Sequence, residues 1–166
     1  MRIGKVAFAA ALAAFAVAAS ASEVRALGAP DAAAVIKERQ DGMKASGGKL
    51  RAIGGVVQAG GDVKTVAADA ADIAAWAKKL PTLFPAGSEE GSKALPTVWT
   101  DRAGFDAKAA AFVDASSKLA AAAAAGDTPG AAAAFGDVRK SCGGCHTGYK
   151  QPSPPPAAAP APAPSN

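Results

Sequence analysis

The stretch TPGAAAAFGDVRKSCGGCHTGYK (residues 128–150) holds both cysteines and the only histidine of the 166-residue chain. Proline in its second position favours the first turn of a helix. In a helix, Cys142 and Cys145 lie three positions apart, and Cys142 and His146 lie four apart. All three side chains therefore project from nearly one face. This stretch predicts a helix that presents two thiols and an imidazole to one flat, apolar partner.

Four interpretations of the C-x-x-C-H pattern compete. A structural disulfide between Cys142 and Cys145 would close a very small loop and leave the adjacent histidine unexplained. A thiol-disulfide oxidoreductase places its reactive thiol at a helix N-terminus after a strand, whereas here the pattern closes a helix. A structural zinc site needs four ligands, and the chain has no further cysteine or histidine.

The fourth interpretation is a c-type haem attachment site. Each thiol adds to a vinyl group of haem to form a thioether, and the histidine after the second cysteine is placed to bind iron. We therefore predict one covalently attached haem c at Cys142 and Cys145, with His146 as an axial iron ligand. The attachment would consume both thiols.

The two ends of the chain predict segments outside the folded domain. Residues 1–21 combine Arg2 and Lys5 with an apolar run and end in an A-x-A triplet, which is typical of a cleaved signal peptide. We expect export to the periplasm without stable membrane insertion. Residues 151–166 are rich in proline and alanine and predict a disordered, extended tail. One domain is then expected over residues 22–150.

The net charge of +4 and the pI near 9.2 do not indicate a nucleic-acid partner. Arg2 and Lys5 would leave with the signal peptide, and no basic run or aromatic platform follows. The nearly balanced charge that remains also predicts no strong electrostatic steering of partners.

Alanine-rich segments separated by proline and glycine favour helices joined by loops. Apolar spacing predicts helices over about residues 30–50, from an N-cap at Asp62 to Leu80, from Thr97 to about residue 125, and from Thr128 into the cysteine cluster. No segment alternates like a strand. We predict an all-α, antiparallel four-helix bundle with haem attached near the C-terminus of the last helix.

Four stretches resemble the class II c-type cytochromes, the family of cytochrome c-prime and the low-spin cytochrome c-556: RQDGMK (39–44), LPTLFPAGS (80–88), VWTDRAGFDAKAAAF (98–112) and GDVRKSCGGCHTGYK (136–150). The resemblance implies haem among the helices, bound through Cys142, Cys145 and His146, and a possible homodimer. Lys150 stands where many members of the family place an arginine.

The family divides over the second axial position of the iron. In the low-spin branch a methionine of the first helix binds there, and Met43 occupies this position. Met43 is also the only methionine left once Met1 is removed, so we expect it to be the sixth ligand; its alternative role is a flexible gap-filler against haem. Arg39 and Gln40, one turn earlier, are candidates for the haem propionates or for a solvated surface. Further haem neighbours are expected among the aromatic residues Trp76, Phe84, Trp99, Phe105, Phe135 and Tyr149.

His146/Met43 ligation predicts a carrier of single electrons by outer-sphere transfer, not an enzyme. Its expected partners are periplasmic or membrane redox proteins that bind through transient contacts. The alternative is a five-coordinate, cytochrome c-prime-like protein that binds nitric oxide or carbon monoxide, if Met43 does not ligate.

Overall fold

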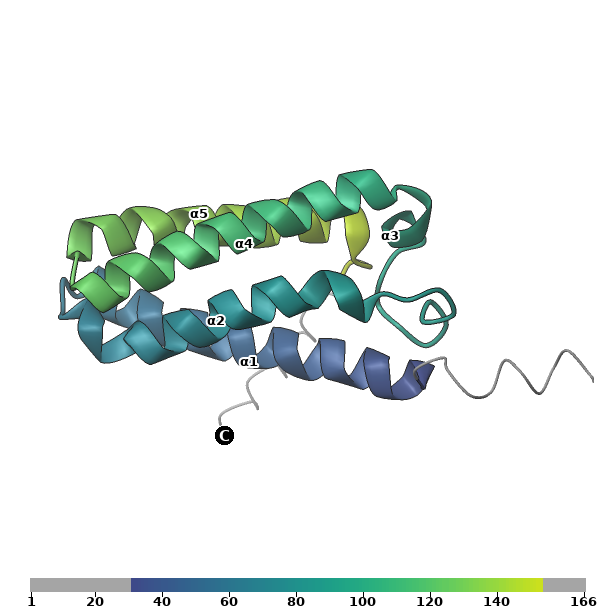
Figure 1. The fold of residues 1–166 in the computed structure, drawn as a ribbon, viewed down its shortest axis with the longest axis horizontal. Coiled ribbons are helices and arrows are strands. Elements are labelled where there is room, and N and C mark those ends of the chain that lie inside the picture. The colour runs from purple at the N-terminus through teal and green to yellow at the C-terminus, as the bar shows by residue number, and fades with distance from the viewer. Residues whose placement is uncertain (1–30, 154–166) are drawn as a thin grey trace, which may run out of the picture.

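A computed structural model describes residues 31–153. The predicted signal peptide and most of the predicted tail lie outside these residues. Four long helices run antiparallel to their neighbours in the chain, with α4 and α5 lying along α1 and α2 (Figure 1). Their bounds are α1 Ala32–Gln58, α2 Ala67–Lys79, α4 Arg102–Ala125 and α5 Thr128–Tyr149. The predicted all-α four-helix bundle is confirmed.

Short helical segments complete the bundle. The 3₁₀ helix η2 (Val63–Val66) precedes α2, η3 (Leu80–Leu83) follows it, and α3 (Thr97–Thr100) lies just before α4. The loop between η3 and α3 sits at the end of the bundle where α5 finishes (Figure 1). No helix within residues 31–153 is both long enough and apolar enough to cross a membrane.

An aspartate side chain accepts a backbone N–H at the start of each of four helices. Such caps satisfy N–H groups that the first turn of a helix leaves free. The capped groups are Ala33 N by Asp31, Lys64 N by Asp62, Gly104 N by Asp101 and Gly130 N by Asp127, at 2.9–3.2 Å. The predicted cap at Asp62 is confirmed, although it begins η2, which then leads into α2.

The core between the four helices is built from one inward stripe on each. Ile53 of α1, Ile73 of α2, Leu119 of α4 and Val138 of α5 are at most 1% exposed. Burying such side chains is the main favourable contribution to folding, about 1.5–3 kcal/mol for each. Several alanines at the same depth let the helices approach closely.

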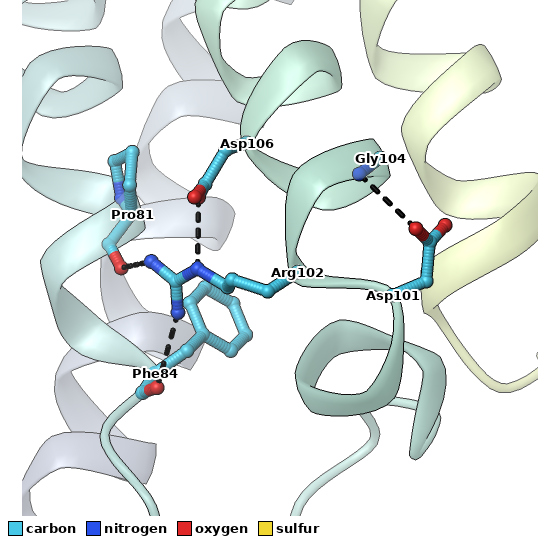
Figure 2. Close-up of polar contacts among 6 residues, drawn as sticks. All are labelled: Pro81, Phe84, Asp101, Arg102, Gly104 and Asp106. Atoms are coloured by element: carbon cyan, nitrogen blue, oxygen red, sulfur yellow. Dashed lines mark hydrogen bonds and ion pairs between the residues drawn. The ribbon is translucent and has the colours of Figure 1, made fainter.

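Two helix boundaries differ from the sequence prediction. The helix predicted from Thr97 is broken at Asp101, whose backbone (φ −118°, ψ 58°) leaves α3 and whose side chain caps α4. Arg102 then ties the start of α4 to the end of η3, with Nη2 donating to Pro81 O at 3.0 Å and Nε to Asp106 at 2.9 Å (Figure 2). The contact with Pro81, 21 positions away, helps to hold the bend at Asp101.

The first helix extends beyond its predicted end near Leu50 to Gln58. Ile53, fully buried, continues its inward stripe. Gly54 allows the ring of Phe135 on α5 to approach, because a Cβ at Gly54 would lie 2.8 Å from that ring. The extra two turns therefore form because α5 packs against them.

Candidate haem-binding site

The C-x-x-C-H residues lie on the last turns of α5, as predicted. Cys142 and Cys145 are half-buried and are not joined in a disulfide, and His146 is exposed. Cys145 and His146 line two cavities of about 320 and 240 Å³, and Cys142 lines the smaller one. The three side chains therefore open onto one region of the bundle, which is what their spacing predicts.

The two cavities belong to a single site. They share five lining residues: Met43, Leu80, Phe105, Cys145 and His146. Sites for cofactors and drug-sized ligands typically have volumes of about 300–1,000 Å³, and the two cavities lie within that range when taken together. All four long helices or their ends contribute to its walls.

The walls of the site are mostly apolar. Ile36, Phe84 and Val98 line the larger cavity, while Leu50, Ile73 and Phe112 line the smaller one. Gly47 also lines the smaller cavity, and a Cβ there would meet no atom within 4 Å. Apolar walls of this kind suit a flat, apolar ring system.

Met43 reaches the site from α1, which packs beside α5. It is partly buried and lines both cavities together with His146. This placement suits either an iron ligand or an apolar contact with the bound group. The choice between these two roles stays a prediction.

Arg39 does not have the solvated surface role considered from the sequence. It is 5% exposed, and its guanidinium donates to Leu83 O at 2.9 Å, Ser88 Oγ at 2.8 Å and Ser88 O at 2.8 Å. It also lies 4.4 Å from the ring centroid of Phe84. Burial lowers the pKa of Arg39, and the charge of Glu89 opposes that shift.

Arg39 still lines the larger cavity while it holds the 83–88 loop. Gln40, in contrast, is exposed and lines the same cavity. Both residues therefore stay candidates for contacts with the edge of a bound group. Of these two residues, Arg39 is engaged in hydrogen bonds to the loop, whereas the side chain of Gln40 forms none within residues 31–153.

The aromatic residues divide into two groups. Phe84, Phe105 and Tyr149 line the larger cavity. Their rings form edge-to-face contacts, with centroids 4.8 Å apart for Phe84 and Phe105 and 5.6 Å for Phe105 and Tyr149. The remaining candidates do not line either cavity: Trp76 lies against Gly42, Trp99 donates to Pro85 O, and Phe135 lies against Gly54.

Residues 93–97, which lead into α3, fix the end of α5 just after His146, and we call these contacts the clamp. Leu95 N donates to Tyr149 O at 3.0 Å, Gln151 N to Lys93 O at 2.9 Å and Thr97 Oγ1 to Gly148 O at 2.8 Å. Ala94 and Lys150 form the isolated β-bridge that results. Sequence reasoning missed this clamp, because its partners are about 50 positions apart and no local pattern marks them.

Tyr149 adds a side-chain contact to the clamp. Its hydroxyl donates to Asp101 Oδ2 at 2.7 Å, while Oδ1 of the same carboxylate caps α4. The hydrogen bond to Asp101 and its negative charge raise the pKa of Tyr149 to about 12. One carboxylate therefore joins the start of α4 to the end of the helix that carries His146.

We expect Tyr149, the only tyrosine in the chain, to ionise near pH 12. The ordinary tyrosine pKa is about 10. Because the folded pKa is raised, the stabilising effect of this hydrogen bond is complete below about pH 10 and is lost as the pH rises toward 12. Difference absorption of tyrosinate follows the titration. In Asp101→Asn we expect the midpoint to fall toward 10; an unchanged midpoint would show that Asp101 is not the cause.

The titrating groups of the motif are neutral near pH 7. Burial raises the pKa of the Cys142 and Cys145 thiols. Although His146 is exposed as a residue, partial burial of its ring lowers its pKa, and the charge of Lys150 adds to the shift. A neutral imidazole is the form that binds metals. The donor set is thus two thiols for thioethers and one imidazole for iron.

These residues fit haem c: the thiols have the required spacing, the imidazole follows the second of them, and the apolar walls suit a porphyrin. Fold and site together define the class, a c-type haem protein built as a helical bundle. Residues 34–150 match the family described as cytochrome C′. The chain belongs to this family, and its cofactor is covalently attached haem c with iron.

Individual relatives come from both branches of the family. A cytochrome c′ from Alcaligenes xylosoxydans xylosoxydans is 50% identical over 62 residues (37% of this chain, 49% of the relative). A cytochrome c-556 from Agrobacterium tumefaciens (strain B2A) is 43% identical over 75 residues (45% and 60%). The matched segments thus span about half to three-fifths of these relatives.

A solved structure extends the likeness over a full chain. It is the nitric oxide complex of a leucine-to-alanine mutant of cytochrome c prime from Alcaligenes xylosoxidans. Its TM-score is 0.70 at 31% identity, and the match covers 76% of this chain and all of the other. The class II resemblance is confirmed, but the low-spin branch is not.

Proposed function

We propose that this protein binds nitric oxide or carbon monoxide at a haem iron that His146 alone ligates, with Met43 beside the open position. The carrying observation is the match to cytochrome c′ over the entire length of a structure described as a nitric oxide complex. This reverses the order of our two sequence hypotheses, since His146/Met43 electron transfer came first. When bound, haem supplies an iron that takes up diatomic gases and exchanges single electrons.

The residues of the chain provide what such a site needs. Cys142 and Cys145 would hold the group covalently, and the neutral imidazole of His146 would bind iron from one side. The clamp over the last turn of α5 keeps the backbone of that turn in place. The apolar side chains around Met43 favour an uncharged diatomic gas over a charged ligand, which would lose its hydration there.

Electron transfer with His146/Met43 ligation is the second candidate. It is supported by Met43 and His146 lining the same two cavities and by the cytochrome c-556 relatives. In either case we propose a periplasmic protein that is not an enzyme. The basis for export is the sequence of residues 1–21.

The reduced absorption spectrum, with and without carbon monoxide, separates the two candidates. We expect a broad high-spin spectrum that changes on addition of the gas, and Met43→Ala should keep this behaviour. Met43→Leu is the matched control, because it keeps an apolar side chain of similar size without sulfur. Sharp low-spin bands that ignore carbon monoxide in the native protein, and that are lost in both variants, would establish Met43 as a ligand instead.

A further inference from the structure

The charged residues around the haem site are all cations. Arg39, Lys93 and Lys150 line the larger cavity, and Lys108 lines the smaller one. No aspartate or glutamate lines either cavity. The site therefore lies in a region of positive potential, although residues 31–153 together carry a net charge of only +2.

The three lysines are free to act on a partner. Lys93 and Lys108 are exposed, Lys150 is half-exposed, and none of them forms an ion pair among residues 31–153. Lys108 lies over the cysteine motif, with Nζ 4.0 Å from where a Cβ on Gly144 would be. Lys150 Nζ contacts only neutral oxygens, of Gln151 and Ser153. We call Lys93, Lys108 and Lys150 the lysine rim.

The rest of the described chain has the opposite charge. Of the 18 Lys and Arg residues, all but Arg2, Lys5 and Arg25 lie in residues 31–153, as do all of the 14 Asp and Glu residues except Glu23. Fifteen cations and thirteen acids give +2. Without the four cations that line the site, eleven cations remain against thirteen acids, or −2. The protein therefore carries its excess positive charge at the haem site.

A bound haem would bring two negatively charged propionates, so the four cations that line the site would still leave a net charge of about +2 there. Arg39, which is buried and already hydrogen-bonded, cannot present its charge to a protein surface. The three lysines of the lysine rim can present theirs to a partner. Long-range attraction between such a patch and an oppositely charged protein raises association rates at low salt.

We propose that the lysine rim is the docking surface for an acidic one-electron redox protein. The inference rests on the haem site but not on which of the two functions it performs. The docked partner gives up one electron and this protein accepts it, or the reverse. Gas binding also needs such a donor, because carbon monoxide binds reduced iron. The net charge alone predicted no strong electrostatic steering of partners. The cations gathered at the site lead us to propose steering of an acidic partner instead.

Binding of an acidic polypeptide tests the surface directly. Holoprotein is titrated with fluorescein-labelled poly-L-glutamate at low ionic strength, and anisotropy is measured. We expect Lys93→Gln/Lys108→Gln to bind about ten-fold more weakly. The matched control, Lys64→Gln/Lys118→Gln, removes the same charge from positions that line neither cavity, and should bind nearly as the native protein does. Equal weakening in both double variants would overturn the proposal.

A pair of small oxidants excludes an indirect effect through the haem. Ferricyanide is an anion and tris(phenanthroline)cobalt(III) is a cation. In Lys93→Gln/Lys108→Gln we expect slower oxidation of the reduced protein by ferricyanide, and unchanged or faster oxidation by the cobalt complex. Equal slowing by both would mean that these lysines act on the haem, and would overturn the proposal. The carbon monoxide spectrum decides the proposed function separately.

Discussion

The double variant Cys142→Ser/Cys145→Ser is expected to lose all covalently bound haem. Serine keeps the size of each side chain but cannot form a thioether, and both thiols face the apolar site that the group would occupy. On a denaturing gel, the haem peroxidase stain should disappear, and the intact mass should equal that of the polypeptide alone.

Two controls sharpen this result. Each single variant keeps one thiol and should retain a reduced stain, whereas Ser141→Ala, at a neighbouring position that lines the smaller cavity, should stain as the native protein does. A native protein whose mass matches the bare polypeptide would contradict covalent attachment at these residues. Persistent staining of the double variant would place the attachment elsewhere in the chain.

Replacing Arg39 by methionine is expected to lower the free energy of unfolding by about 2–4 kcal/mol. The variant keeps the apolar stem, but three buried acceptors, on Leu83 and Ser88, lose their charged donor. Ser88 is fully buried, so water does not replace the donor without local opening. Guanidinium unfolding of the holoprotein, followed by far-UV circular dichroism, measures the change.

Arg39→Lys separates charge from geometry. Lysine keeps the positive charge but lacks the planar fork that reaches Leu83 O and both Ser88 oxygens, so we expect it to recover less than half of the lost stability. Gln40→Ala, at the neighbouring exposed position, should change stability little. An Arg39→Met variant as stable as the native protein would show that the arginine serves the bound group and not the loop.

The local features of the bundle were predictable because each depends on residues close in sequence. Asp62 as a cap, Thr128 at the start of the last helix and the shared face of Cys142, Cys145 and His146 all follow from helical periodicity and capping. The structure agrees with each of them.

Features that depend on distant partners were not predictable. The bend at Asp101 forms because its carboxylate caps α4 and accepts from Tyr149, 48 positions away. From its helix alone, Arg39 was a candidate either for the edge of the bound group or for a solvated surface, yet it is buried because the 83–88 loop folds over it. The spacing of residues within one helix predicts neither the contact of Asp101 with Tyr149 nor the contact of Arg39 with the 83–88 loop.

The sequence by itself determined the helical class, the positions of most helices and the chemistry of the C-x-x-C-H motif, because these depend on contacts within a few residues. Only the tertiary structure decided which side chains surround the site, how the end of α5 is clamped and where the excess positive charge lies. Those properties arise when side chains from α1, the loop before α3, α4 and α5 meet in space. Net charge and helical periodicity do not predict which distant residues come into contact.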